Sequence, residues 1–117
     1  MAFLITSCLT LPKNPETLAE QQIKACLPNA IIMSQALNRQ DVWAKTLIIK
    51  WKENNKFRGH AYSIYLYPPG TNKLWAYDRD YGSTRVRAYK TNAKSVGQYA
   101  NKSRGLYEPL TIANYLD

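Results

Sequence analysis

Two apolar runs joined by a proline-glycine turn constrain the fold of this chain more than any other feature. The run "HAYSIYLY" begins at His60, the run "KLWAYD" ends at Asp78, and "PPGTN" lies between them. Both runs are rich in the aromatic and β-branched residues that favour strands. Pro69 and Gly70 suit the two central positions of a type II turn. The stretch therefore predicts a β-hairpin in which a histidine opens one strand and an acid closes the next.

The length of this turn predicts which residues of the hairpin face one another. With residues 68–72 in the loop, Tyr67 lies opposite Lys73. His60 then lies opposite Asp80 and diagonal to Asp78, and the three side chains share one face. Either carboxylate can accept the imidazole N–H. A shift of one residue would move both acids to the other face, so this expectation depends on the register.

Helix signals precede the hairpin. "NPETLAEQQIKAC" begins with a typical N-cap and first-turn proline, which predicts a helix over 15–25. Pro28 lacks the N–H that a helix interior needs, so we expect a break before it. A second helix over 28–38 is apolar on most sides, which indicates a buried central helix.

Strands and a further helix complete the predicted order. "VWAKTLIIKWK" alternates as a strand over 42–52, and "STRVRAY" predicts a strand over 83–89, with a helix over 93–102. Helices followed by a run of strands indicate an α+β fold, in which N-terminal helices pack on a four-stranded antiparallel meander. The chain has 117 residues, so we expect a single domain over 1–117.

The net charge of the chain indicates which kinds of molecule it binds. The chain has 16 Lys and Arg against 8 Asp and Glu, a net charge of +8, which favours anionic partners. The lysines and arginines are scattered along the sequence rather than clustered. A nucleic acid is therefore a less favoured partner than an acidic protein. No apolar run approaches the roughly 20 residues that span a bilayer, so no membrane partner is expected. With one histidine and two cysteines we expect no metal site and no cofactor, and reduced thiols rather than a disulfide.

Three residues on the predicted elements could carry chemistry together. Cys26 would lie at the positive end of the second helix, which favours the thiolate. An imidazole held by a carboxylate could deprotonate that thiol, so Cys26, His60 and Asp78 or Asp80 form a candidate triad. Each also has an ordinary interpretation: a small core cysteine, a polar strand end and turn residues. The weaker candidate nucleophiles are Cys8, Ser34 and Ser63.

These residues also resemble a known superfamily. "ACLPNAIIMSQALNRQDVWAKTLIIKW" followed by "GHAYSIYLYPPGTNKLWAYDRDYGS" is similar to the papain-like and transglutaminase-like cysteine hydrolases, including their bacterial toxin and effector branch. There a cysteine heads the central helix, "HA" opens a strand, and an aromatic-rich strand ends in Asp. The resemblance covers about residues 20–85. It implies a minimal papain-like fold with catalytic Cys26, His60 and Asp78.

Departures from that pattern concern the substrate cleft and the oxyanion hole. The interval from Cys26 to His60 leaves little room for a second lobe, and Pro28 is unusually close to the cysteine. Gln21 and Gln22 precede the cysteine, as a hole-forming glutamine does in the papain-like enzymes, but both fall in the first predicted helix.

The resemblance implies acyl transfer through a thioester on a protein amide, as in a protease, deamidase or transamidase. The net charge of +8 indicates a protein substrate of acidic character. The alternative is a non-catalytic basic α+β binding module, either an inhibitor protein or a nucleic-acid binder. Stacking would then involve strand aromatics: Tyr62, Tyr65, Tyr67, Trp75 and Tyr77. No charged segment precedes a long apolar core at the amino terminus, so we expect a cytoplasmic protein or one delivered to a target cell without a cleavable signal.

Overall fold

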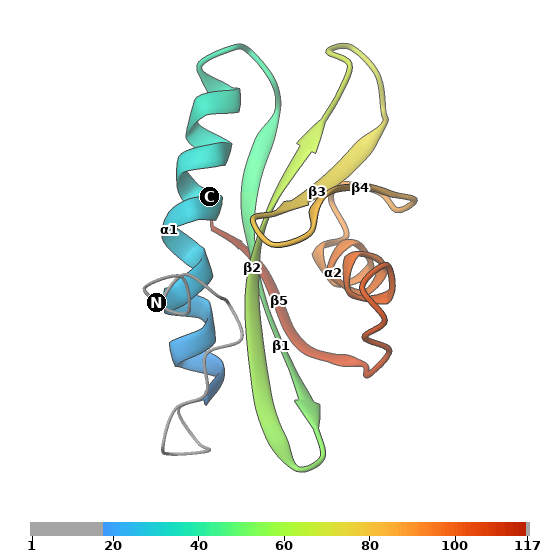
Figure 1. Ribbon diagram of the computed structural model, residues 1–117. Helices are drawn as coiled ribbons and strands as arrows, with labels where there is room; N and C mark the ends of the chain where they lie inside the picture. Colours follow the sequence, from blue (N-terminus) through green and yellow to red (C-terminus); the bar gives the residue numbers. More distant parts are fainter. Residues whose placement is uncertain (1–17, 117) are drawn as a thin grey trace.

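The computed structural model describes residues 18–116, which form one five-stranded antiparallel sheet between two helices. Figure 1 shows α1 (Leu18–Asn38) along one face of the sheet and α2 (Ala93–Lys102) against the other. The predicted α+β fold is therefore confirmed. The strands lie in the order β4-β3-β2-β1-β5. Their bounds are β1 Ala44–Glu53, β2 Lys56–Leu66, β3 Leu74–Asp78, β4 Gly82–Val86 and β5 Leu110–Leu116.

The hairpin formed by β2 and β3 has the predicted register. Ser63 pairs with Tyr77, and the Tyr67 N–H donates to the Lys73 carbonyl at 3.0 Å. In the turn, the Thr71 N–H donates to the Pro68 carbonyl and Gly70 has a φ of 81°, as the third position of a type II turn requires. Local turn geometry therefore places the side chains of β3 where the sequence predicted them.

The sheet has one strand more than the predicted meander. β5 pairs with the outer edge of β1, where Leu47 lies opposite Tyr115. The four-strand prediction is thus short by one strand, because β5 joins the sheet only after the chain has passed over its face as α2. A pairing between residues so distant in the sequence has no local signal.

The two predicted N-terminal helices are one continuous helix, α1, with Pro28 inside it. Pro28 is exposed, and buried residues precede and follow it on the face toward the sheet. Packing on both sides of Pro28 thus offsets the backbone hydrogen bond that the proline removes. The expectation of a buried central helix is also wrong, because Ile32 on the outer face is 63 % exposed. The residues that face the sheet have helical spacing: Ile23, Cys26, Ala30 and Ser34.

Gly59 brings α1 unusually close to β2. A Cβ at Gly59 would lie 2.6 Å from the Ala19 carbonyl oxygen and 2.9 Å from the Ile23 side chain. The Gly59 N–H donates to Gln22 Oε1 at 2.9 Å, which ties the helix to the strand at the same point. The helix therefore lies directly against the strand one residue before His60.

The main hydrophobic core lies between the sheet and α2. Val96 and Ala100 of α2 are fully buried against side chains of the central strands. A smaller cluster lies on the opposite face, where Cys26 and Ala30 of α1 pack on Ala61 of β2. The sheet thus separates two apolar layers, and the candidate site lies where one strand ends between them.

Candidate active site

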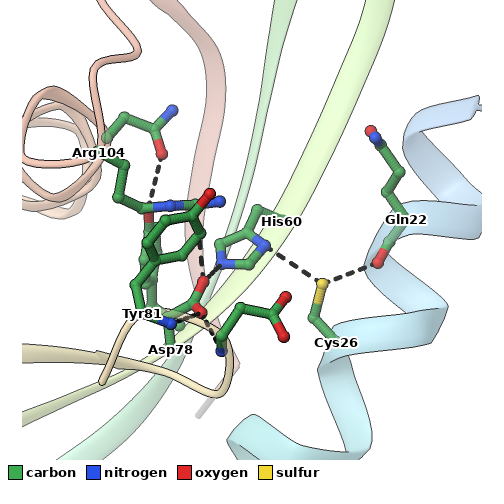
Figure 2. A network of polar contacts seen from close by, with 9 residues as sticks. Gln22, Cys26, His60, Asp78, Tyr81 and Arg104 are labelled. Atoms are coloured by element: carbon green, nitrogen blue, oxygen red, sulfur yellow. Dashed lines mark hydrogen bonds and ion pairs between the residues drawn. The ribbon is translucent and has the colours of Figure 1, made fainter. Parts of the chain in front are cut away.

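His60 lies at a point of the sheet where β2 has a strand on one side only. It pairs with Ile49 of β1, whereas β3 pairs with β2 only from Ser63 to Leu66 and ends at Asp78. The imidazole can therefore be reached from both layers. Figure 2 shows Cys26 of α1 on one side of the ring and Asp78 on the other.

The three predicted site residues are in contact in the order Cys26, His60, Asp78. Cys26 Sγ lies 3.2 Å from His60 Nδ1, and His60 Nε2 lies 2.5 Å from Asp78 Oδ2. The three residues are 4 %, 1 % and 3 % exposed. A sulfur, an imidazole and a carboxylate are thus in contact at a position that is almost closed to bulk solvent.

This alignment indicates the tautomer of the neutral imidazole. A carboxylate can only accept, so the close contact between His60 Nε2 and Asp78 Oδ2 favours the tautomer that carries its hydrogen on Nε2. Nδ1 then presents its lone pair to Cys26 Sγ. The ring is oriented as a base toward the sulfur, which is the arrangement that nucleophile activation requires.

Asp78 is both a turn residue and the partner of His60. Its Oδ1 accepts the backbone N–H groups of Asp80 at 2.6 Å and of Tyr81 at 2.9 Å, while Oδ2 faces His60. One carboxylate oxygen of Asp78 therefore stabilises the turn, as expected of an ordinary turn residue. The other oxygen contacts His60, as the candidate triad predicts. Asp80 is exposed and contributes a backbone N–H, so of the two candidate acids Asp78 contacts the imidazole.

The environment shifts the pKa of both ionisable groups downward. Burial lowers the pKa of His60 and the charge of Arg104 lowers it further, against the opposing effects of the contact with Asp78 and the charge of Asp80. Burial works to raise the pKa of Asp78, but the contact with His60 and the charges of His60 and Arg104 outweigh it, so that pKa lies below its usual range. Near neutral pH the pair is therefore a neutral imidazole beside a carboxylate.

Cys26 differs from expectation in its redox state and its place in the helix. The structure has it disulfide-bonded, so the expectation of reduced thiols is wrong. The other cysteine of the chain, Cys8, lies outside the described residues. Cys26 is also inside α1 rather than at its start, so the positive helix end does not act on the sulfur. Cys26 Sγ instead lies 2.9 Å from the Gln22 carbonyl oxygen.

The other sequence candidates have different environments. Ser34 and Ser63 share a hydrogen bond of 2.8 Å, and Thr46 donates to Ser34 at 3.1 Å, so these hydroxyls bond with one another beneath α1. Gln21 is exposed, whereas Gln22 is buried with its Oε1 on Gly59 and, among the described residues, no hydrogen-bond partner for Nε2. In Figure 2 the Gln22 side chain extends away from the sulfur, which gives it no direct part in the triad.

A small cavity opens beside the sulfur. It has a volume of about 10 Å³, room for about one water molecule. Its walls come from α1, β2 and the end of β3: Cys26, Asn29, Ala30, Ala61, Tyr77, Asp78 and Arg79.

Arg104 is a neighbour of the site that the sequence did not reveal. Its Nη1 lies 3.5 Å from Asp78 Oδ2 and donates to the Tyr62 hydroxyl at 2.8 Å. It follows α2, far from Asp78 in the sequence, so only the tertiary structure brings it there. The histidine, cysteine and acid could be found because their order along the chain follows a pattern, which Arg104 does not.

The described part of the chain contains neither a group of metal-ligating side chains nor a membrane-spanning helix. Residues 18–116 contain no cluster of His, Cys, Asp and Glu that could hold a metal ion. None of the helices in this range has the length and apolar character needed to cross a membrane.

Comparison with known proteins returns no match to a protein-family model, to a curated protein or to a solved structure. We therefore infer function from the geometry of Cys26, His60 and Asp78.

Proposed function

We propose that the protein in its reduced state is a small papain-like cysteine hydrolase that acts on an amide of a protein substrate. The observation that carries this proposal is the alignment of Cys26 Sγ, 3.2 Å from His60 Nδ1, with His60 Nε2 2.5 Å from Asp78. Burial of all three groups strengthens their electrostatic interactions. Protease, deamidase and transamidase activities share the first half-reaction that such a triad performs.

The steps follow from the tautomer of His60. His60 Nδ1 takes the proton of the Cys26 thiol while the sulfur attacks the amide carbon, and the carbonyl oxygen becomes an oxyanion. The C–N bond then breaks, the departing nitrogen receives the proton from His60, and a thioester remains on Cys26. Water, or an amine in transamidation, loses a proton to His60 and attacks the thioester, and Cys26 recovers that proton as it leaves. Asp78 keeps the ring oriented throughout.

Reduction of the Cys26 disulfide must precede this chemistry. A thiol reductant supplies two electrons and two protons, which converts the disulfide into two thiols while the reductant becomes a disulfide itself. Disulfides persist in oxidising compartments and are reduced in the cytosol. The proposed enzyme is therefore latent outside a cell and active within the cytosol of its own cell or of a target cell.

The charge of the chain suggests the character of the substrate. A net charge of +8 attracts acidic segments of proteins. Arg79 is exposed and also lines the cavity beside Cys26 Sγ, so a cation lies where a substrate would approach the sulfur. We therefore propose that the substrate has an acidic segment next to the reacting amide.

Alkylation of the reduced protein tests the proposal. After reduction with a phosphine, iodoacetamide should modify Cys26 faster than Cys8, with a rate that depends on pH, and peptide mass spectrometry separates the two sites. His60→Ala should slow the modification of Cys26 and leave that of Cys8 unchanged. Equal, slow modification of both cysteines would contradict the proposal. Cys8→Ser provides a control that contains Cys26 alone.

A second candidate function is the basic binding module. Tyr65 pairs with Trp75, and Arg85 lies 5.9 Å from the Trp75 ring, so aromatic and cationic groups meet on one face of β2, β3 and β4. Stacking on such a face with phosphate contacts is typical of single-strand binders. Tyr62 cannot take part because it is 1 % exposed. This module predicts that Trp75→Ala weakens the binding of an oligonucleotide, with an affinity that falls steeply with salt. Under the hydrolase proposal, any oligonucleotide binding comes from the net charge alone, so Trp75→Ala should leave it unchanged.

A further inference from the structure

A buried guanidinium faces the acid of the candidate triad on the side away from His60. Arg104 Nη1 lies 3.5 Å from Asp78 Oδ2, the same oxygen that contacts His60 Nε2. The Arg104 side chain is 7 % exposed. Figure 2 shows Arg104 and Tyr81 on one side of Asp78 and His60 on the other. The carboxylate is therefore shared between a permanent cation and a titratable ring.

Arg104 is held in this place by several contacts. Nη1 donates to the Tyr62 hydroxyl at 2.8 Å, and that hydroxyl donates to Asn101 Oδ1 at 2.8 Å. The guanidinium also lies 4.4 Å from the Tyr81 ring, within the range of a cation–π interaction. The Arg104 N–H donates to the Asn101 carbonyl at 2.9 Å, which fixes the backbone after α2. A cation with so many partners has a defined position relative to Asp78.

The charges of this cluster determine which form of His60 is stable. An isolated buried carboxylate would favour a proton on the neighbouring imidazole, because the pair is then neutral. With Arg104 present, the carboxylate is already neutralised, and a proton on His60 would leave the buried cluster with an extra positive charge. The other groups that face the ring are Cys26 on α1, Tyr62 on β2 and Asp80 after β3, and of these only Asp80 brings a negative charge. Burial raises the pKa of Tyr62, so its hydroxyl stays neutral.

We propose that Arg104 is a positioning residue of the site: it neutralises Asp78 so that His60 stays an uncharged base with its Nδ1 lone pair on Cys26. This inference deepens the proposed function and rests on it. The direction of the His60 pKa, which burial and then the charge of Arg104 lower, agrees with this role. The role differs from a structural one because it depends on charge as well as on packing.

The single histidine of the chain allows a direct test. The imidazole signal of His60 is followed by NMR against pH in the full-length protein, in the wild type and three variants. Arg104→Gln removes the charge but keeps an N–H donor for Tyr62, and Arg104→Lys keeps the charge. Arg87→Gln is the matched control on an exposed arginine. The His60 midpoint should move to higher pH in Arg104→Gln and stay near the wild-type value in Arg104→Lys and Arg87→Gln.

The outcomes separate this inference from the proposed function. Equal midpoints in Arg104→Gln and the wild type, with both folded, would overturn the role of Arg104. If Arg104→Gln does not fold, Tyr62→Phe, which removes the hydroxyl that holds the guanidinium, should raise the midpoint, and an unchanged midpoint would overturn the role. The reduced proteins are also alkylated across the same pH range, and the acid limb of the Cys26 rate should move with the midpoint. If the His60 midpoint moves while the alkylation rate of Cys26 does not change, the result would support the effect of Arg104 on His60 but contradict the proposed hydrolase function.

Discussion

The two ring nitrogens of His60 have different partners, so the imidazole links an acid on one side to a sulfur on the other. Nε2 faces the Asp78 carboxylate and Nδ1 faces Cys26 Sγ. The imidazole is almost fully buried, so neither contact competes with water. Asp78 itself is fixed by two backbone N–H groups of the following turn. At the scale of single residues, the turn that ends β3 therefore fixes the carboxylate that contacts the imidazole.

Asp78→Asn tests this orientation. The amide keeps the size of the carboxylate but can donate to Nε2, which would place the ring hydrogen on Nδ1 and remove the lone pair from Cys26. We expect activity of the reduced protein, as kcat/KM on a peptide amide, to fall by about two to four orders of magnitude. Asp80→Asn is the matched control and should keep a rate close to that of the wild type. It keeps the backbone N–H that Asp78 accepts, and the exposed Asp80 side chain acts on His60 only through its charge, the smallest of the influences on the His60 pKa. Equal rates in both variants would refute the assignment of Asp78.

The low pKa of His60 also makes stability depend on pH. A histidine whose pKa is lowered in the folded state binds its proton more readily when unfolded, so its contribution to stability is present above about pH 6.5 and is lost as pH falls toward the folded pKa. The free energy of unfolding should then fall by at most about 1.4 kcal/mol per pH unit from this group. Asp78, whose pKa is also lowered, adds a further loss below about pH 4.

Denaturant unfolding of the wild type and His60→Gln from pH 7 to pH 5 checks this expectation. Because His60 is the only histidine in the chain, the dependence should disappear in the variant. A wild-type protein of constant stability over this range would show that His60 is not shifted downward.

Helix α1 and strand β2 bring the sulfur to the ring. Their close approach depends on Gly59, since a side chain there would meet the Ala19 carbonyl oxygen. The ion pair between Glu20 on α1 and Lys50 on β1 lies at the same end of the helix. The distance from Cys26 to His60 therefore depends on how closely α1 packs against β2, and not on any single residue of the triad.

Gly59→Ala should separate the two elements. A backbone oxygen cannot move aside as a flexible side chain can, so we expect a loss of about 1–3 kcal/mol in the free energy of unfolding. The reduced variant should also show slower alkylation of Cys26, because the sulfur moves away from His60. Lys56→Ala, on an exposed position of the same strand, is the control and should change neither quantity. Unchanged stability in Gly59→Ala would show that α1 and β2 do not approach so closely.

The molecule as a whole is basic, with a net charge of +8. Within the candidate site, by contrast, a carboxylate and a guanidinium of opposite charge lie together. Asp78 and Arg104 neutralise one another at the core of the site, whereas most lysines and arginines are exposed or half-buried. Such a field acts on the approach of a substrate and leaves the chemical step unchanged. Its effect should appear in association rates and in their dependence on salt.

If the reduced protein is the proposed hydrolase, its reaction with acidic peptides should depend on salt. Raising the ionic strength from about 0.01 M to 1 M shortens the Debye length from about 30 Å to about 3 Å. We expect kcat/KM for an acidic peptide to fall over this range, while kcat/KM for a neutral peptide of the same length stays constant. A parallel response of the two peptides would exclude steering by the net charge.

The hairpin and its register followed from the sequence, because a turn of defined geometry and alternating strands are local properties. These local properties alone place His60 and Asp78 on one face, and α2 was also predicted from its own residues. Other features are tertiary: the continuity of α1 through Pro28, the fifth strand, the disulfide at Cys26 and the place of Arg104. Each depends on contacts between residues far apart in the chain, whose free energies outweigh the local preference or have no local counterpart.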